Sequence, residues 1–502
     1  MTVYNINLGI GWASSGVEYA QAYRAQSFRK KHIDAKFVFM EWISYENIQH
    51  LTANMGFQDD EVIWLYQYFS DIPLAATSYT EADLLATIPH PLTRTEQEGK
   101  VKRFFFDEAD LFVTAYLTKE NEKYVDRAEF VSRGLLIRKD YYSFTRVFSE
   151  FYAPKDDKAH LYQRRFYNRD GSTAYEEIID GENTIFKMKD AWLFSKEDFI
   201  SYFIKKLNLT SKDIVIMDRA TDVGQAIFEV KGDAKIGTIV HADHYSDNVT
   251  TEDYILWNNY YEYEFQHAHL IDFFVTSTDA QTQLLQEQFE KYTPYRPKIY
   301  TIPVGSYPAL RYPETKRRPF SLITASRLAT EKHIDWLVQA VVKAKVFVPE
   351  LTFDIYGEGG ERQKIEALIE QHQAAEYIRL KGHQHMANRY TEYEVYIAGS
   401  TSEGFGLTLM EAVGSGLPII GFDVPYGNPT FVTDGVNGFL IPKETDTVDA
   451  QLIDRISDKI VQIFMTENLE TMHEISYQVG ANYLASVIDD KWQKLVEEVT
   501  HD

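Results

Sequence analysis

The chain has 502 residues, of which 44% are hydrophobic and 14% aromatic, and none is cysteine. Its 51 Lys and Arg residues stand against 75 Asp and Glu residues, which gives a formal net charge of −24 at pH 7. This composition excludes a chain that is disordered throughout, a disulfide scaffold and a cysteine nucleophile. The charge argues against nucleic acid or an anionic membrane as partner, since both attract basic surfaces. The length predicts more than one domain.

The N-terminal residues do not have the pattern of a targeting signal. Residues 1–10 lack a basic segment, and Asn5 and Asn7 interrupt their apolar residues. No stretch approaches the ~18 apolar residues of a membrane-spanning helix. We therefore expect a cytoplasmic protein, with at most a peripheral location at the inner face of the cell membrane.

The chain begins with the pattern of a β-α-β unit. Residues 3–8 alternate as a strand, residues 17–31 suit a helix, and residues 36–40 form a second strand. This is typical of a parallel sheet. The pattern returns much later, with a helix at 280–291 and with strands at 213–217, 234–241, 270–276 and 298–303. We predict one Rossmann-like domain in two parts, residues 1–43 and 210–305.

Residues 44–209 have a different pattern, that of an inserted antiparallel β-meander. Its predicted strands are 102–106, 111–117, 134–138, 142–148, 161–167 and 173–179. Asp170-Gly171 predicts a tight turn, and residues 180–183 predict another. The Tyr and Phe residues of this segment either fill one face of the sheet or form a platform for an extended acceptor or a partner chain.

A second Rossmann-like domain is predicted over residues 306–480, followed by a C-terminal helix over residues 481–502. Its strands are 320–325, 351–356, 378–380, 393–397 and 418–422, and its helices are 334–347, 361–372 and 407–415. This regular alternation is typical of a doubly wound sheet. The last ~45 residues are predicted to be helical, with one apolar face formed by Ile453, Ile456, Ile460 and Ile463.

The most specific motif lies in residues 400–411. Gly404 and Gly406 precede a predicted helix. The backbone N–H groups from Gly404 to Leu407, including that of Phe405, can therefore bind an anion such as a diphosphate. Glu403 lies in the loop, where it can reach a sugar. Glu411, two turns into the helix, can reach a ribose diol. The alternative is a helix cap with a surface glutamate.

A second motif supplies two cations. Arg327 and Lys332 follow the strand at 320–325, near the strand end where open α/β sheets bind ligands. Two fixed cations there can neutralise a leaving diphosphate without a metal. The alternative is a pair of ordinary surface cations.

Two weaker motifs have meaning only beside the first two. The glycine loop with Gly9, Gly11, Ser15 and Gly16 lacks the spacing of a dinucleotide fingerprint or a P-loop. In residues 241–244, His241 is interpreted as a group that hydrogen-bonds a substrate hydroxyl. A metal ligand and a purely structural histidine remain alternatives.

The sequence contains no Asp-x-Asp pair. Many nucleotide-sugar enzymes hold Mg²⁺ or Mn²⁺ with such a pair of carboxylates. We therefore expect no metal and no cofactor.

Over residues 320–441 these motifs resemble the retaining glycosyltransferases of family 4, which have the GT-B fold of two facing Rossmann-like domains. The resemblance implies that Arg327 and Lys332 bind the nucleotide diphosphate. It implies that Glu403 contacts the transferring sugar and that Glu411 holds the ribose. It further implies roles for residues outside these motifs: Ser15 and Gly16 at the diphosphate, His241 at a sugar hydroxyl and His383 near the base.

Residues 4–20 and 47–54 resemble more closely the GtfA subunits, the catalytic chains that glycosylate serine-rich-repeat adhesins of streptococci and lactobacilli. This resemblance extends over essentially the whole chain. It implies transfer of N-acetylglucosamine from UDP-GlcNAc to Ser/Thr hydroxyls of the adhesin, with UDP-glucose as the alternative donor. It also implies a hetero-oligomer, such as a heterotetramer, with a GtfB-like partner subunit.

Two other functions are less consistent with these features. An α-glucosyltransferase or phosphorylase with a small acceptor would not need the aromatic meander. A non-catalytic, lectin-like chaperone would not need Arg327, Lys332, Glu403 and Glu411 together.

Overall fold

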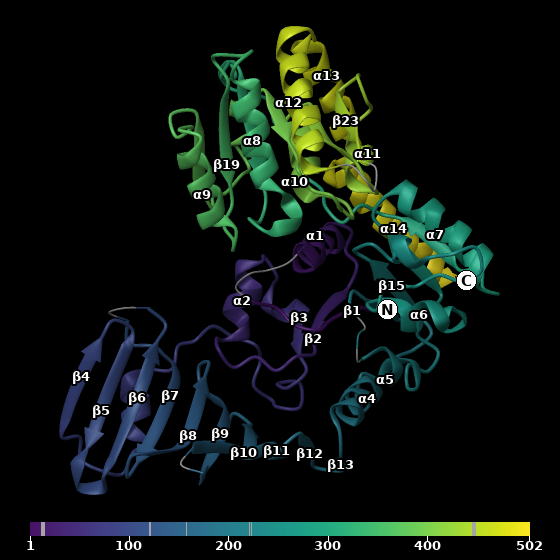
Figure 1. The fold of residues 1–502 in the computed structure, drawn as a ribbon. Coiled ribbons are helices and arrows are strands. Elements are labelled where there is room, and N and C mark those ends of the chain that lie inside the picture. Colours follow the sequence, from purple (N-terminus) through teal and green to yellow (C-terminus); the bar gives the residue numbers. More distant parts are fainter. Residues whose placement is uncertain are drawn as a thin grey trace. The chain divides into compact units, whose positions relative to one another are not determined.

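The computed structural model describes residues 1–11, 16–119, 122–156, 158–219, 221, 223–443 and 448–501. The chain divides into two compact units, shown with their elements in Figure 1. The first contains Met1–Ala22 and Asp34–Gly237, and the second contains Tyr23–Ile33 and Thr238–Asp502. No helix within the described ranges is long and apolar enough to cross a membrane.

The first unit contains a set of parallel strands in the order β14-β1-β2-β3. They are β1 (Val3–Asn7), β2 (Ala35–Phe39), β3 (Val62–Trp64) and β14 (Ile214–Met217). Helix α1 (Gly16–Lys30) follows β1, and α2 (Ile48–Asn54) precedes β3. The predicted strands at 3–8, 36–40 and 213–217 are confirmed, whereas β3 was not predicted. Pairing of Val3 with Ile214 shows that the chain returns to this sheet after a long insertion.

The insertion is a ten-stranded antiparallel sheet in which every strand pairs with the next along the chain. Its strands are β4 (Arg94–Glu98), β5 (Val101–Phe106), β6 (Leu111–Leu117), β7 (Val125–Ser132), β8 (Leu135–Tyr142), β9 (Arg146–Lys155), β10 (Lys158–Tyr167), β11 (Thr173–Asp180), β12 (Asn183–Lys187) and β13 (Trp192–Leu193). The predicted meander is therefore confirmed. Both predicted turns are present, because Gly171 and Gly181 have φ angles of +82° and +64°.

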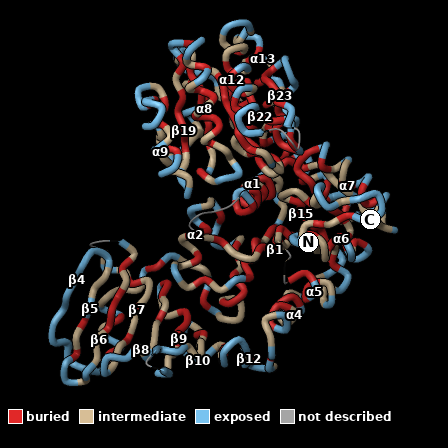
Figure 2. Tube along the Cα trace, in the orientation of Figure 1, coloured by how far each residue is buried: buried red, intermediate tan, exposed pale blue. Residues whose placement is uncertain are grey.

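Some strand predictions in this sheet were wrong or absent. Residues 142–148 do not form one strand, because Tyr142 ends β8 and Arg146 begins β9. The amide of Ser143 donates to the carbonyl of Thr145 at 2.9 Å, which turns the chain between them. Strands β4, β7, β12 and β13 were not predicted. All residues of β4 are exposed, as Figure 2 shows, so it has no apolar alternation to detect.

Many aromatic residues of the insertion form a core rather than an open platform. The rings of Phe166 and Tyr175 stack at 4.2 Å on neighbouring strands. Phe186 stacks at 4.1 Å on Phe199 of helix α4 (Lys196–Lys206). These four side chains are at most 2% exposed. The core interpretation therefore holds for this part of the sheet.

The second unit contains a six-stranded parallel sheet in the order β20-β19-β18-β21-β22-β23. Its strands are β18 (Ser321–Ala325), β19 (Thr352–Tyr356), β20 (Ile378–Gly382), β21 (Val395–Ile397), β22 (Ile419–Asp423) and β23 (Gly438–Pro442). Helices α8 (Ile334–Ala344), α9 (Arg362–Gln371) and α10 (Leu407–Gly414) lie between strands. This is the predicted doubly wound sheet, with β23 in addition.

Further elements of the second unit come before and after this sheet. Strand β15 (Lys235–Val240) carries the chain into the unit, and β16 (Phe273–Thr276) pairs in parallel with β17 (Lys298–Thr301). Helix α7 (Asp279–Tyr292) lies between those two strands in the chain. The C-terminal part forms α12 (Asp449–Met465), α13 (Leu469–Gly480) and α14 (Ala485–His501). The four isoleucines predicted to share one face are all buried on α12.

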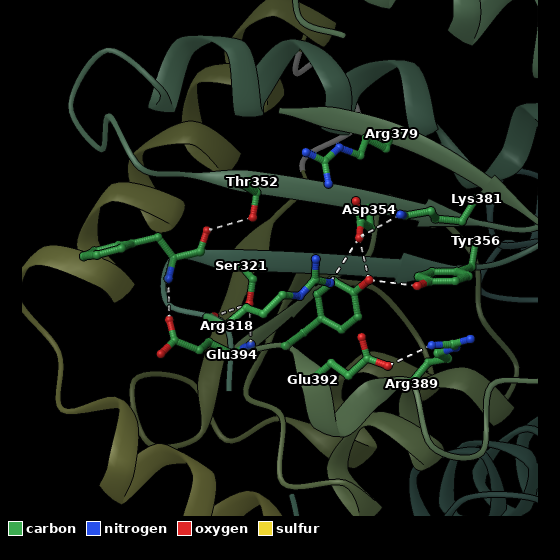
Figure 3. A network of polar contacts seen from close by, with 12 residues as sticks. Arg318, Ser321, Thr352, Asp354, Tyr356, Arg379, Lys381, Arg389, Glu392 and Glu394 are labelled. Atoms are coloured by element: carbon green, nitrogen blue, oxygen red, sulfur yellow. Dashed lines mark hydrogen bonds and ion pairs between the residues drawn. The ribbon is translucent and has the colours of Figure 1, made fainter. Parts of the chain in front are cut away.

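One buried carboxylate of the six-stranded sheet is compensated by polar partners, as Figure 3 shows. Asp354 on β19 accepts hydrogen bonds from the Tyr393 hydroxyl at 2.6 Å and from the Arg318 guanidinium at 3.1 Å. The Lys381 ammonium lies 3.7 Å away. A buried charge is tolerated only when it is paired and hydrogen-bonded. This network therefore ties β19 to the segments that enter β18 and β21.

Candidate functional site

The two most specific sequence motifs come together at one point of the six-stranded sheet. At this point the order of its strands reverses. Strands β18 and β21 are neighbours there, and the two loops that follow them carry residues 326–333 and 398–406. Loops at the carboxyl ends of such neighbouring strands form the ligand site of doubly wound sheets. The position of both motifs is therefore the one that the fold favours for binding.

Lys332 and Glu403 form an ion pair in this site. The Lys332 ammonium lies 2.6 Å from a Glu403 carboxylate oxygen, and the side chains are 17% and 20% exposed. Lys332 ends the short helix η5 (Thr330–Lys332), and the next turn packs against Gly399. A Cβ added to Gly399 would lie 2.7 Å from the Lys332 carbonyl. The pair thus combines a cation and a carboxylate at the carboxyl ends of the strands.

Arg327 lies apart from that pair. Its side chain is 73% exposed, and its guanidinium bonds Glu331 at 3.0 Å. An exposed guanidinium of this kind is free to turn toward a phosphate, because a surface ion pair contributes little stability. The structure therefore places Arg327 at the edge of the site rather than among its buried groups.

The loop that opens α10 presents backbone rather than side chains. Gly406 has a φ of +88° and caps the helix without a side-chain hydrogen bond. The first N–H groups of a helix have no partner within the helix, so those at the start of α10 can bind an anion. Phe405 is buried, with its ring 5.1 Å from that of Phe431, and only its backbone can serve a ligand. Leu407 is the first residue of the helix.

Gly404 brings the loop against the end of β15. A Cβ added to Gly404 would lie 2.8 Å from the carbonyl oxygen of His241, which is closer than real side chains come. The structure therefore brings together His241 and Gly404, two residues predicted for the site from distant parts of the sequence. Glycine is required here by close packing of two backbones.

Glu411 lies on α10 beside a buried tyrosine. The Tyr390 hydroxyl donates to its carboxylate at 2.9 Å. Burial raises the pKa of Glu411, and the hydrogen bond from Tyr390 partly opposes that effect. This partner fixes the direction of the carboxylate, so that Glu411 presents an oriented acceptor for hydroxyl groups.

Residues around His241 support the Glu403 loop. His244 is buried and bonds Gln288 at 2.6 Å, and burial lowers its pKa to about 4, so it is a structural histidine. The Tyr426 hydroxyl lies 3.3 Å from the second ring nitrogen of His244. The amides of Tyr426 and Gly427 both donate to the Glu403 carbonyl at 2.8 Å. Among the described residues, no group of three or more His, Asp or Glu is arranged to hold a metal ion.

Tyr426 was missed by the sequence analysis. It follows β22, the strand next to β21, and so lies at the same edge of the sheet as the two motifs. The rule that loops at this edge face the ligand could have found it. Ser402 lies within the predicted motif, but its hydrogen bond to Asp243 was not predicted.

The remaining predicted residues are Gly16, His383 and Ser15. Gly16 is the first residue of α1, and a Cβ added there would meet no described atom within 4 Å. His383 is exposed in the loop after β20. Ser15 lies outside the described residues.

Two families match separate parts of the chain. The GtfA extended beta-sheet domain matches residues 94–190, and glycosyl transferases group 1 matches residues 311–472. The first range contains β4 through β12, and the second contains the six-stranded sheet.

Full-length relatives are also similar. The GtfA subunit of a UDP-N-acetylglucosamine–peptide N-acetylglucosaminyltransferase from Streptococcus pneumoniae is 56% identical over 503 residues, which cover 100% of both chains. A crystal structure of the pneumococcal O-GlcNAc transferase GtfA with UDP and GlcNAc has a TM-score of 0.95 at 55% identity, covering 100% of this chain and 99% of that one. A chain in a GtfA/B complex has a TM-score of 0.97 at 52% identity, with full coverage of both.

These similarities confirm the family and the fold that the motifs predicted, since they extend over the whole chain and include the inserted sheet. The fold is GT-B, with two Rossmann-like α/β domains and an antiparallel insertion. The chain belongs to the GtfA subunits of the UDP-N-acetylglucosamine–peptide N-acetylglucosaminyltransferases.

Proposed function

We propose that this chain transfers N-acetylglucosamine from UDP-GlcNAc to Ser/Thr hydroxyls of a serine-rich-repeat adhesin, with retention of configuration at C1. The observation that carries the proposal is the Lys332–Glu403 pair at the point where the sheet order reverses. Relatives that share this chain's full length bear the name of that reaction.

The donor diphosphate takes the place of Glu403 as partner of Lys332. Arg327 turns in from the edge to add a second cation, and the amides from Gly404 to Leu407 complete the anion site. Glu403, released from Lys332, then orients the sugar. Glu411 accepts hydrogen bonds from the ribose, and His241 contacts a sugar hydroxyl. Ser15 and Gly16 contact the diphosphate, and His383 lies near the base.

The chemical step needs no nucleophile from the protein. The bond from C1 to the diphosphate oxygen breaks through an oxocarbenium-like state, and its electron pair stays on the leaving oxygen. The acceptor hydroxyl bonds C1 on the same face and passes its proton to that oxygen. Lys332, Arg327 and the helix amides stabilise the charge that develops on the diphosphate. No step requires a metal.

The same proposal includes the setting of the reaction. The chain works in the cytoplasm with a GtfB-like partner subunit, which helps to hold the acceptor. Support comes from the GtfA/B complex of a chain that is 52% identical.

One experiment tests donor, acceptor and metal together. The chain is incubated with a Ser/Thr-rich polypeptide and either UDP-GlcNAc or UDP-glucose, with and without EDTA and with and without a GtfB-like subunit. Mass spectrometry of the intact polypeptide should show additions of N-acetylglucosamine that EDTA does not reduce. If only glucose is added to the polypeptide, the donor is UDP-glucose and not UDP-GlcNAc. Sugar-dependent peptide binding without any added mass would overturn the enzyme in favour of a lectin.

The role of Glu403 is tested separately. Glu403→Gln keeps the size and the hydrogen-bonding oxygen but removes the charge that faces Lys332. We expect strongly reduced transfer with unchanged thermal stability. Transfer at the wild-type rate would show that the charge of Glu403 has no essential role.

A further inference from the structure

A cavity of about 750 Å³ lies within the first unit, outside the site described above. One wall is formed by residues 43–54, which include helix α2, and another by residues of strands β6 to β9. The volume lies in the range of small-molecule sites, roughly 300–1,000 Å³. Neither the sheet core nor the candidate active site uses this space.

Aromatic rings and polar groups share the walls. The rings belong to Tyr45, Trp64, Tyr116, Tyr124, Tyr141, Tyr142 and Phe148. Tyr45 is 52% exposed, and its hydroxyl donates to the carbonyl of Ile10 at 2.8 Å, which fixes the ring in place. Ile10 belongs to the glycine loop after β1. The cavity therefore begins beside a loop that was predicted to approach the donor.

One buried polar group in the wall lacks a partner. Ser143 is 3% exposed, and its hydroxyl finds no hydrogen-bond partner within the described part of the chain. Leaving a buried hydroxyl unpaired costs about 1–3 kcal/mol. Such a group is explained when a ligand completes its hydrogen bonding.

The charges in the wall nearly balance. The carboxylates are Glu46, Glu122 and Asp126, and the cations are Lys100, Lys119 and Arg127, with His50 in addition. His50 lies 3.3 Å from Glu46, and the Thr77 hydroxyl donates to Asp126. Burial raises the pKa of both Glu46 and Asp126. The walls suit a neutral ligand with many hydroxyl groups rather than a phosphate.

Rings that cover the apolar face of a sugar, beside carboxylates and hydroxyls that bond its edge, form a carbohydrate site. If the proposed function holds, UDP-GlcNAc and UDP carry negative charge and the unmodified acceptor has no sugar ring. Only the transferred sugar is both neutral and cyclic. We propose that this cavity is a second carbohydrate site, which binds an N-acetylhexosamine already linked to Ser or Thr of the acceptor.

Binding to the full-length chain without donor tests this site. The probes are a Ser/Thr-rich peptide with one α-linked N-acetylglucosamine, the same peptide without sugar, and the methyl glycoside of N-acetylglucosamine. We expect calorimetry to show that the glycopeptide binds at least about tenfold more tightly than the plain peptide. Glycoside that competes with the glycopeptide shows that the ring itself is recognised. If the glycopeptide binds more tightly than the plain peptide but the glycoside does not compete, the site recognises the sugar together with the Ser or Thr that carries it.

Ser143→Ala separates a role in binding from a role in folding. Removing an unpaired buried hydroxyl should leave the Tm unchanged or raise it. We expect the same variant, and Asp126→Asn, to weaken glycopeptide binding by about tenfold. Tyr45→Ala should weaken it too, whereas Tyr162→Ala should not, because Tyr162 is an exposed tyrosine of β10 that does not line the cavity.

Two results would overturn the second site: equal affinity for glycopeptide and plain peptide, or glycopeptide affinity that is unchanged in Ser143→Ala and Asp126→Asn. Failure of the proposed function is recognised independently. It would appear as absence of transfer from either donor in the mass assay, which does not depend on the cavity variants.

Discussion

Lys332 is the cation whose surroundings are most confined in the candidate site, since its ammonium lies 2.6 Å from Glu403 and its side chain is 17% exposed. A charge held in place away from water stabilises a developing opposite charge more than a mobile surface charge does. Arg327, 73% exposed, has no such restriction. The two cations therefore differ in how far the protein itself positions them.

Lys332→Ala should slow transfer by about 10²–10³-fold in kcat, because a fixed group at the leaving diphosphate is lost. Lys364→Ala is the matched control. Lys364 is a lysine of the same unit that pairs with Asp335 and Glu361 on the surface. Steady-state kinetics of both variants should separate them. Wild-type kcat in Lys332→Ala would remove that residue from the diphosphate site.

Glu264 predicts a pH dependence of stability. It is buried, one carboxylate oxygen has no hydrogen-bond partner in the described ranges, and burial raises its pKa to about 7. Between its ordinary pKa of 4.5 and about 7, the folded chain holds a proton that the unfolded chain has lost. Its contribution to stability is therefore present at low pH and is lost as the pH rises through 7.

Glu264→Gln cannot lose that proton. The Tm of the variant relative to the wild type should therefore increase between pH 5 and pH 8, by at least about 2 °C. Thermal unfolding followed by circular dichroism at several pH values gives this difference. A Tm difference that is constant across this range would show that Glu264 does not titrate there.

At the scale of elements, the loop that opens α10 is defined by backbone contacts. Gly404 touches the end of β15, and the amides after β22 bond the Glu403 carbonyl. Two segments outside this loop, at His241 and at residues 426–427, thus hold it in place.

Gly404→Ala should lower both the Tm and the rate of transfer, because the added Cβ would lie 2.8 Å from the His241 carbonyl. Gly16→Ala provides the comparison, since an added Cβ there meets no described atom within 4 Å. We expect Gly16→Ala to keep its Tm and to lose transfer only, through contact with the donor. Normal transfer in Gly16→Ala would contradict the proposed role of Gly16.

Strands of the insertion show where local pattern was sufficient. The segments at 111–117 and 173–179 were predicted within one residue, because apolar alternation and an Asp-Gly turn define them locally. The segment at 142–148 was wrong because Tyr142 and Phe148 are both buried, which resembles one continuous strand. A turn at Ser143 separates them, and residues 143–145 contain no Gly, Pro, Asn or Asp, the stronger turn residues.

At the scale of the whole molecule, the two ends of the sequence meet in the second unit. Residues 23–33, which include the second half of helix α1, belong to that unit, and there the Phe28 ring lies 5.7 Å from that of Trp492 on α14. Ser27 donates to Asp489 at 2.6 Å, in a buried position. Helix α14 therefore holds the second half of helix α1 in place.

Trp492→Ala should destabilise the protein by about 3–5 kcal/mol, since a large buried ring is removed. Val487→Ala, which trims a partly exposed residue of the same helix, is the control. Chemical denaturation gives both free energies of unfolding. Equal values for the two variants would show that α14 does not hold α1 in this way.

Local patterns in the sequence were sufficient to predict the glycine loop before α10, the cations after β18, the alternation of the two Rossmann-like domains, and the family. These depend on contacts within a few residues of one another. Three contacts became visible only in the folded chain: Lys332 pairs with Glu403, His241 meets Gly404, and β3 joins the parallel strands. Such contacts join segments tens to hundreds of residues apart, whose pairing depends on the packing of the whole sheet rather than on any local pattern.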